Sequence, residues 1–266
     1  MALVHACFDR NGHVIVPEIV LGSDERQLRP VILLHAFPLH AGMWARQVAA
    51  IERSGGLAVA LDAPGFGESG LSSRVSDMET LADGVFEVWR GLKLPPAVIV
   101  GLSMGGYAAL RAVQRHPEMV RALVLASTKA EADSEEAREN RYRQATQVLE
   151  EGSEVLLDMQ TSFLNDPDEH PDVAEMIRSA RPEAVAAALR GMAIRPSSVR
   201  FLEEIRVPTL VIAGEDDPLT PPETMKTLAE GIPEARFETL NAKHLSNIGA
   251  ADDFNALLTS FIERFR

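Results

Sequence analysis

Five short apolar runs recur along this sequence, and stretches with helical periodicity separate them. The runs span residues 31–34, 57–61, 97–100, 123–126 and 209–213, and each contains β-branched side chains. None of them alternates between apolar and polar residues, which is the pattern of strands that are buried on both faces. Helices must then cover both sides of the sheet. The runs therefore predict an α/β domain with a doubly wound, mostly parallel sheet.

Helices and a hairpin complete the predicted sheet. The helical patterns span residues 43–54, 78–93, 105–116 and 222–231. Before the first apolar run, Asn11-Gly12 is a strong signal for a two-residue hairpin turn. We therefore expect the first 30 residues to form two strands that add an antiparallel edge to the sheet.

One region, residues 129–198, interrupts the alternation of strands and helices. Four helical patterns cover it, at residues 133–151, 153–164, 172–180 and 182–193. The first begins with an Asp133…Glu136 capping pattern. Met159 and Phe163 belong to a set of apolar positions at helical spacing, most of which we expect to pack and a minority to line a pocket. The region is predicted to be an all-helical insertion between two parallel strands.

The composition excludes several classes of protein. The net charge is −13, whereas binding to nucleic acid or to an anionic membrane surface requires basic patches. The single cysteine, Cys7, cannot form an intrachain disulfide. No apolar run is long enough to span a bilayer, and no secretory signal is visible. We therefore expect a cytoplasmic protein with no nucleic-acid or membrane partner. The composition is compatible with a homo-oligomer.

The segment Gly101-Leu102-Ser103-Met104-Gly105 follows a predicted strand and precedes a predicted helix. In a sharp strand-to-helix turn, small residues around the serine let the backbone fold back and present the hydroxyl in a cleft. The N–H groups at the start of the helix then face the site, where they can hold an oxyanion. Ser103 is therefore the predicted nucleophile. The alternative is a glycine-rich turn whose serine only caps a helix.

A serine hydroxyl is a weak nucleophile and needs a base, which in this motif order comes late in the chain. Three histidines follow Ser103. His116 ends the helix after the serine, and His170 precedes a helix of the insertion. His244 lies in a loop after a predicted strand at residues 235–240, so it is the predicted base.

The acid that orients the histidine is expected at the carboxyl end of a strand between Ser103 and His244. Glu215-Asp216-Asp217-Pro218 follows the apolar run at residues 209–213. We favour Asp217, which precedes a proline turn, and keep Asp216 as the second candidate.

An oxyanion hole needs two N–H donors. Met104, the residue after the nucleophile, is one candidate. Phe37, in the loop after the first apolar run, is the other, and its ring would overhang an acyl pocket. His35 is expected to brace this loop rather than to bind a metal, because no second ligand stands at zinc spacing. The sequence predicts neither a metal nor another cofactor.

These residues and two further motifs resemble the α/β-hydrolase fold superfamily along nearly the whole chain. Residues 62–69, Asp-Ala-Pro-Gly-Phe-Gly-Glu-Ser, are similar to the D-x-P/R-G-F/H-G-x-S turn after the fourth strand of that family. His35-Ala36-Phe37-Pro38 resembles its H-G-x-P oxyanion loop, with alanine in place of the usual glycine. The resemblance implies an eight-stranded, mostly parallel sheet with a helical cap after the sixth strand. It implies a core of residues 1–128 and 199–266 and a cap of residues 129–198.

Within that superfamily, His244-Leu245-Ser246-Asn247 and the serine motif look like the 3-oxoadipate enol-lactonase group. Those sequences usually carry Glu and Pro soon afterwards, where this chain has Gly249-Ala250-Ala251-Asp252. The loop with Phe37 is similar to that of esterases and perhydrolases. The resemblance therefore implies a carboxylic ester hydrolase that acts on small esters or lactones. Perhydrolysis, thioester hydrolysis and C–C bond hydrolysis on the same triad are alternatives, and a non-enzymatic ligand-binding protein is a third reading.

The insertion is rich in Ala, Met and Leu and poor in aromatic side chains. Methionine and alanine make adaptable apolar walls. We therefore expect a closed, medium-sized apolar substrate pocket, with Phe37, Met159 and Phe163 among its walls. Such a pocket would favour short acyl chains of about two to six carbons.

Overall fold

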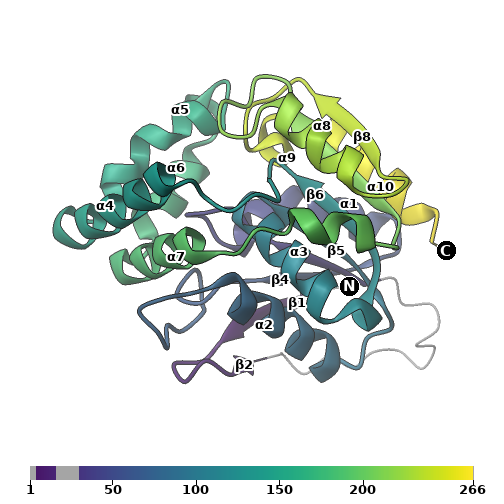
Figure 1. Cartoon of the computed structure of the whole chain (residues 1–266), viewed down its shortest axis with the longest axis horizontal. Helices are drawn as coiled ribbons and strands as arrows, with labels where there is room; N and C mark the ends of the chain where they lie inside the picture. The colour runs from purple at the N-terminus through teal and green to yellow at the C-terminus, as the bar shows by residue number, and fades with distance from the viewer. Residues whose placement is uncertain (1–3, 16–29, 266) are drawn as a thin grey trace.

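The computed structural model describes residues 4–15 and 30–265, and an eight-stranded sheet forms its centre (Figure 1). The strands lie in the order β2-β1-β4-β3-β5-β6-β7-β8. The pairing of β1 with β2 is antiparallel, and the other described pairs are parallel. The predicted doubly wound, mostly parallel sheet is therefore confirmed. The strands are β1 (Val4–Phe8), β2 (Val14–Ile15), β3 (Pro30–Leu34), β4 (Leu57–Leu61), β5 (Ala97–Leu102), β6 (Val120–Ala126), β7 (Thr209–Gly214) and β8 (Arg236–Leu240).

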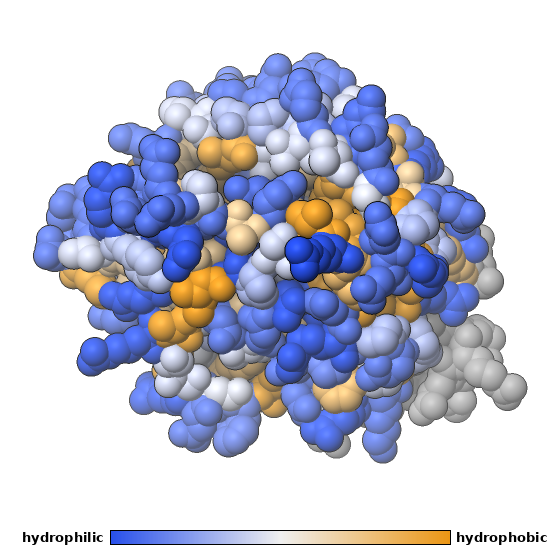
Figure 2. Space-filling view, in the orientation of Figure 1, coloured by the Kyte–Doolittle hydropathy of each residue, from blue (hydrophilic) through white to orange (hydrophobic). Residues whose placement is uncertain are grey.

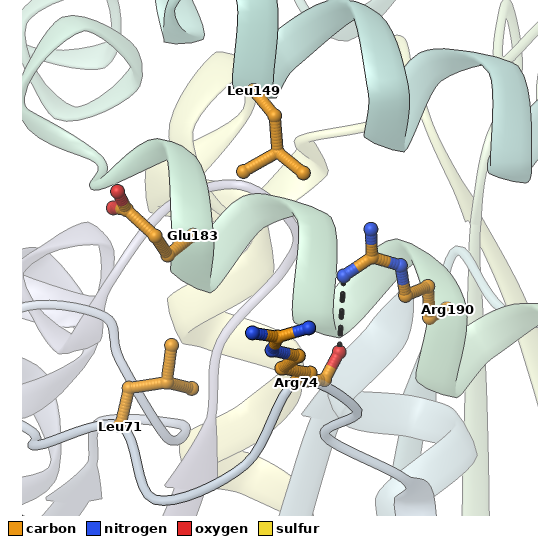
Figure 3. A pocket seen from close by; sticks show the side chains of 5 residues that line it. All are labelled: Leu71, Arg74, Leu149, Glu183 and Arg190. Atoms are coloured by element: carbon orange, nitrogen blue, oxygen red, sulfur yellow. Dashed lines mark hydrogen bonds between the residues drawn. The ribbon is translucent and has the colours of Figure 1, made fainter.

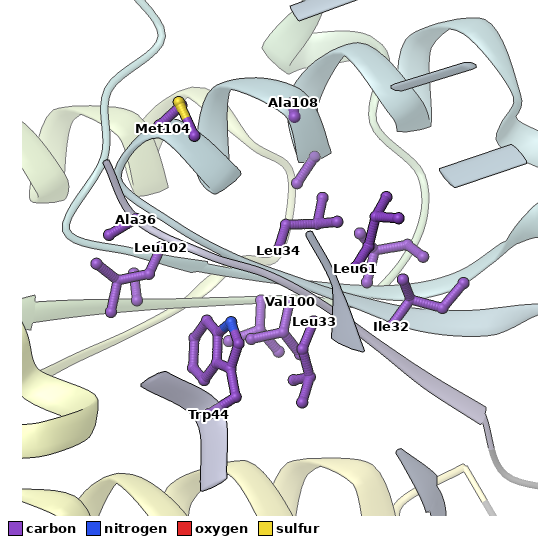
Figure 4. Packing of buried hydrophobic residues seen from close by; sticks show 14 of the residues in the cluster. Ile32, Leu33, Leu34, Ala36, Trp44, Leu61, Val100, Leu102, Met104 and Ala108 are labelled. Atoms are coloured by element: carbon purple, nitrogen blue, oxygen red, sulfur yellow. The ribbon is translucent and has the colours of Figure 1, made fainter. Parts of the chain in front are cut away.

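Helices cover both faces of the sheet, whose central strands β3, β4 and β5 are buried along their whole length. Figure 4 shows Leu34 directed towards Ala108 on one face and Leu33 directed towards Trp44 on the opposite face. The Trp44 ring lies 6.2 Å from the ring of Phe254, where the first and last helices meet. The α-helices of this core are α1 (Ala45–Arg53), α2 (Met78–Gly91), α3 (Met104–Arg115), α8 (Pro222–Gly231), α9 (Ser246–Gly249) and α10 (Ala251–Glu263), and short 3-10 helices span Ala41–Trp44 and Pro117–Met119.

The amino-terminal hairpin has the predicted form within residues 4–15. Cys7 pairs with Ile15 and Phe8 with Val14, and Gly12 adopts a φ of 84° in the turn. This positive φ explains the Asn-Gly dipeptide, because glycine adopts it without steric cost. The remainder of the predicted first 30 residues, 16–29, lies outside the described residues.

A helical insert separates β6 from β7, as predicted. In Figure 1 its helices lie together beside the sheet. Its first helix starts later than the capping pattern suggested. Ser134, not Asp133, caps it, and Ser134 Oγ accepts a hydrogen bond from the Ala137 N–H at 3.2 Å. Asp133 is buried, and its carboxylate forms ion pairs with Arg141 and Arg195 instead of capping the helix. The elements are α4 (Glu135–Glu151), α5 (Gln160–Phe163), α6 (Pro171–Ser179) and α7 (Pro182–Ile194), with 3-10 helices at Ser153–Met159, Pro167–Glu169 and Val199–Glu204.

The insert is hydrogen-bonded to the core at several points. The Ser76 N–H donates to the Ala187 carbonyl at 3.0 Å. The guanidinium of Arg181 reaches the Gly65 carbonyl at 2.6 Å, in the turn after β4. These contacts join the insert to the turn and the loop that follow β4.

The outer surface is mostly polar on the face drawn in Figure 2, where hydrophobic residues form scattered groups. This agrees with the acidic composition, because charged side chains prefer water. Within residues 4–15 and 30–265, no helix combines the length and the apolar character needed to cross a bilayer.

Helix α3 approaches the central strands so closely that glycine is required at its start. A Cβ atom on Gly105 would lie 2.1 Å from the Leu34 carbonyl oxygen of β3. A Cβ atom on Gly101 would lie 2.2 Å from the Gly105 carbonyl oxygen. Both neighbours are backbone atoms within the packed centre, so neither can move aside without shifting an element.

We expect Gly105→Ala to lower the free energy of unfolding by roughly 3 kcal/mol, because the added methyl group overpacks the α3–β3 contact. Gly249→Ala is the matched control, since its Cβ atom would meet its nearest neighbour at 3.8 Å. Urea denaturation of both variants measures the difference. Equal stabilities for the two variants would contradict the close approach.

Candidate active site

Ser103 occupies the turn between β5 and α3. Its φ of 55° and ψ of −113° lie in a region that non-glycine residues rarely adopt. The Ser103 N–H donates to the Ala126 carbonyl at 3.0 Å, and its carbonyl accepts from Thr128 Oγ1 at 2.9 Å. The strained backbone is thus held from β6 and the loop after it, and the half-buried side chain lines a pocket.

The carboxylate of Asp217 lies directly behind the His244 ring. His244 Nδ1 lies 2.8 Å from Asp217 Oδ2, and both side chains are almost fully buried. Asp217 also accepts hydrogen bonds from the Leu219 N–H at 2.8 Å and from Thr220 Oγ1 at 2.6 Å. The other predicted acid, Asp216, is exposed. The contacts therefore single out Asp217 as the partner of His244.

These contacts also set the ionisation of Asp217. Burial acts to raise its pKa, but the hydrogen bond and charge of His244 and the hydrogen bonds from Thr220 outweigh it and lower the pKa to about 2. The carboxylate is therefore ionised at neutral pH and at moderately acidic pH.

A cavity of about 430 Å³ contains Ser103 and His244 together. The volume falls within the range of pockets that hold small ligands. The predicted wall residues Phe37, Met159 and Phe163 all line it. Phe163 also stacks on the His244 ring, with the ring centroids 5.8 Å apart. The three candidate pocket residues and two of the triad candidates thus share one cavity.

Of the two candidate oxyanion donors, Phe37 lines this cavity and Met104 directly follows Ser103 in the chain. Met104 is the first residue of α3, and Phe37 follows β3 in the loop that the sequence motif predicted. Within the described part of the chain, neither backbone N–H has a hydrogen-bond acceptor.

His35 and His116 have structural contacts, as expected. His35 Nδ1 contacts the Ala36 carbonyl at 2.9 Å, while His35 Nε2 accepts from the Ala63 N–H at 2.9 Å, so the ring joins two loops. His116 caps the end of α3, and His170 precedes α6. Among the described residues, no group of three or more His, Cys, Asp or Glu side chains is arranged to hold a metal ion.

The pocket wall formed by α4 is polar, so the prediction of an apolar pocket is wrong for this wall. Composition alone suggested apolar walls, whereas the face of α4 turned to the cavity carries polar groups. The lining positions of α4, residues 137, 140, 141 and 144, recur at helical spacing and so lie on one face of the helix. Asp133 and Lys129 precede this helix at the same wall. The unpredicted lining residues are Tyr107, Lys129, Asp133, Ala137, Asn140, Arg141, Gln144, Met192, Leu219 and Thr220.

A second cavity of about 480 Å³ lies between α7, α4 and the loop after the turn at residues 62–69 (Figure 3). Arg190 Nη1 crosses it to the Arg74 carbonyl at 3.3 Å. Among the described residues, its lining contains no serine, histidine or aspartate, so no candidate for the predicted triad belongs to it. The lining residues are Leu71, Arg74, Leu149, Glu183 and Arg190.

Several known proteins are similar to this chain. A family model described as alpha/beta hydrolase fold matches residues 29–251. A thermophilic esterase from Thermogutta terrifontis, solved with malate bound, is 35% identical with a TM-score of 0.83, over 89% of this chain and 90% of that one. An enol-lactonase from Burkholderia xenovorans is 28% identical with a TM-score of 0.80, over 89% and 92%. A 3-oxoadipate enol-lactonase from Acinetobacter baylyi is 25% identical over 89% of this chain and 90% of its own.

The buried pair predicts how stability depends on pH. Because folding lowers the pKa of Asp217 from 3.8 to about 2, the carboxylate stabilises the fold above pH 3.8. This contribution, about 2 kcal/mol, is lost as the pH falls from 3.8 towards 2. Asp217→Asn should therefore remove part of the loss of stability between about pH 5 and pH 2.

Urea denaturation across this pH range measures the effect, with Asp216→Asn as the exposed control. If the two asparagine variants showed the same pH dependence as the unmodified protein, Asp217 would not carry this contribution.

Proposed function

Because this chain belongs to the α/β-hydrolase fold family, we propose that it is a serine hydrolase of small carboxylic esters or lactones. The observation that carries the proposal is the buried Asp217–His244 hydrogen bond of 2.8 Å in the cavity that Ser103 lines. The named activities of the similar esterase and enol-lactonase support the same class of reaction.

Ser103 is the proposed nucleophile. Because His244 Nδ1 is hydrogen-bonded to the Asp217 carboxylate, this nitrogen carries the proton of the neutral ring. Nε2 is then the basic nitrogen, and it accepts the Ser103 proton as Oγ attacks the carbonyl carbon. The buried, ionised Asp217 stabilises the imidazolium that forms, and the imidazolium then protonates the leaving alcohol.

The N–H groups of Phe37 and Met104 are the proposed donors to the tetrahedral oxyanion. Donors that are already fixed need no reorganisation when the charge develops, which is why such holes contribute strongly to rate. In the second half of the reaction, His244 takes a proton from the water that attacks the acyl-enzyme, and it returns this proton to Ser103 Oγ as the bond to the acyl group breaks and the acid leaves. A lactone follows the same steps, with its alcohol remaining attached to the acyl group.

Residues 129–198 are the proposed cap over this site, and residues 1–128 and 199–266 are the catalytic core. Phe163 and Met159 come from the cap and line the cavity together with Phe37 of the core. Substrate size and shape would then depend on the cap, while the chemistry depends on the core.

Ser103→Ala should abolish hydrolysis without loss of folding, since the hydroxyl lies in a cavity rather than in the packed core. Removing a triad serine costs on the order of 10⁶ in turnover. A panel of p-nitrophenyl esters, lactones and thioesters measures the activity, and labelling by a fluorophosphonate reports on the nucleophile itself. Near-normal hydrolysis by the alanine variant would overturn the proposal, and absence of both hydrolysis and labelling in the unmodified protein would favour a ligand-binding protein.

Asp217→Asn should reduce turnover by on the order of 10⁴, because the amide favours the wrong tautomer of His244. Asp216→Asn should change turnover little, since that side chain is exposed and does not contact His244. Steady-state kinetics with the best ester of the panel measures both variants. The reverse ranking would assign the acid to Asp216.

A further inference from the structure

We propose that the substrate carries a free carboxylate, which Arg141 and Lys129 bind at the α4 wall of the cavity. The inference rests on the proposed ester or lactone hydrolysis and names the chemical class of its substrate. It comes from a group of charges that the triad does not use.

The wall is built around the buried carboxylate of Asp133. Its side chain is only 1% exposed, and Arg141 Nε donates a hydrogen bond to its Oδ2. Arg195 Nη1 lies 2.7 Å from its Oδ1, and Lys129 Nζ lies 3.7 Å from the same oxygen. Three cations thus surround one carboxylate. Burial alone would raise the pKa of Asp133, but the hydrogen bond from Arg141 and the charge of Arg195 keep it below its ordinary value.

Arg195 is fixed as a structural partner of Asp133. It is 5% exposed, and its guanidinium donates to the Met192 carbonyl at 2.9 Å and to the Glu131 carbonyl at 3.0 Å. The Arg195 guanidinium also lies 4.1 Å from the centroid of the Tyr107 ring. One buried arginine is enough to neutralise one buried carboxylate, and the remaining two cations therefore exceed what packing requires.

Arg141 and Lys129 are the cations that face the cavity with Ser103 and His244. Both line it, and their side chains are 20% and 29% exposed, whereas Asp133 is the acidic residue of the described lining. This positive wall stands in a chain with a net charge of −13. A local charge opposite in sign to that of the whole molecule attracts an anion specifically to this cavity.

A carboxylate suits the wall by its size and its hydrogen bonding. A guanidinium presents planar N–H donors to a carboxylate, and an ammonium supplies a point charge beside it. Asn140 and Gln144 lie on the same wall and add polar groups. Since the cavity of about 430 Å³ must hold the reacting ester as well, the anion belongs to a small substrate such as the half-ester of a short dicarboxylic acid.

The test compares two substrates of nearly equal shape. One is the methyl half-ester of glutaric or adipic acid, which is charged at neutral pH, and the other is the same methyl ester with a terminal carboxamide. Release of methanol gives kcat/KM for each. We expect the half-ester to be preferred by about tenfold or more, as for one charge-assisted hydrogen bond, and the preference to fall with added salt. If the methyl ester of the carboxamide substrate were hydrolysed at least as efficiently as the half-ester, the inference would be overturned and the proposed function would stay intact.

Variants locate the preference at the wall. The ratio of the two kcat/KM values does not depend on the fraction of active protein, so it tolerates partial loss of folding. Lys129→Met and Arg141→Met should each lower the ratio by about tenfold, while Arg141→Lys should keep most of it. Arg138→Met removes an exposed charge from the same helix and should leave the ratio unchanged. Equal ratios in all four variants would exclude this wall as the binding site.

A competition experiment separates a carboxylate site from a general anion site. Glutarate and inorganic phosphate are compared as inhibitors of the hydrolysis of a neutral p-nitrophenyl ester. We expect stronger inhibition by glutarate, and weaker glutarate inhibition in the Lys129→Met variant. Stronger inhibition by phosphate would contradict the assignment to a carboxylate. If the unmodified protein cleaved none of these esters and Ser103 failed to react with a fluorophosphonate, the proposed function itself would fail.

Discussion

The contact between the start of α3 and the central strands is the constraint on which this structure depends. The helix can lie against β3 only because Gly105 has no side chain, and the turn can close only because Gly101 has none. The strained φ of Ser103 follows from this tight turn. The parallel sheet then brings the loops after β3, β7 and β8 to the same edge, since carboxyl ends of parallel strands lie together. Phe37, Asp217 and His244 therefore reach one place from distant parts of the chain.

Much of this arrangement was predictable from local patterns. Strands that are buried on both faces are continuous apolar runs, and β3, β4 and β5 have this pattern. The strand, glycine-rich turn and helix around Ser103 indicated the nucleophile. The order of the motif along the chain then indicated His244 and Asp217. The structure separates Asp217 from Asp216 through a contact that no spacing could give, the hydrogen bond to His244. The sequence placed both carboxylates in the loop and favoured Asp217 from its proline turn alone, whereas the contact with His244 depends on tertiary structure.

The polar wall was not predictable in the same way. Helix α4 carries charged residues around most of its surface, so its pattern does not say which face meets the cavity. Asp133 looked like a helix cap because its spacing to Glu136 fits that motif. One of its ion-pair partners, Arg195, lies 62 residues later in the chain and contacts Asp133 only when the insert folds back on the core. A pairing of this kind is decided by tertiary packing, and composition gives no sign of it.

The insert also contributes to the surroundings of the proposed base. The Phe163 ring stacks on His244, and the Phe163 carbonyl accepts a hydrogen bond from the Leu245 N–H at 3.0 Å. Lys243 Nζ donates to the Thr161 carbonyl at 2.6 Å. The helix α5 therefore holds the loop of His244, while α4 of the same insert holds the cationic wall. Because both elements belong to one docked unit, a movement of the insert that changed substrate binding would also disturb the contacts that orient the histidine. Under the proposed function, substrate selection and positioning of the base are therefore coupled through the insert.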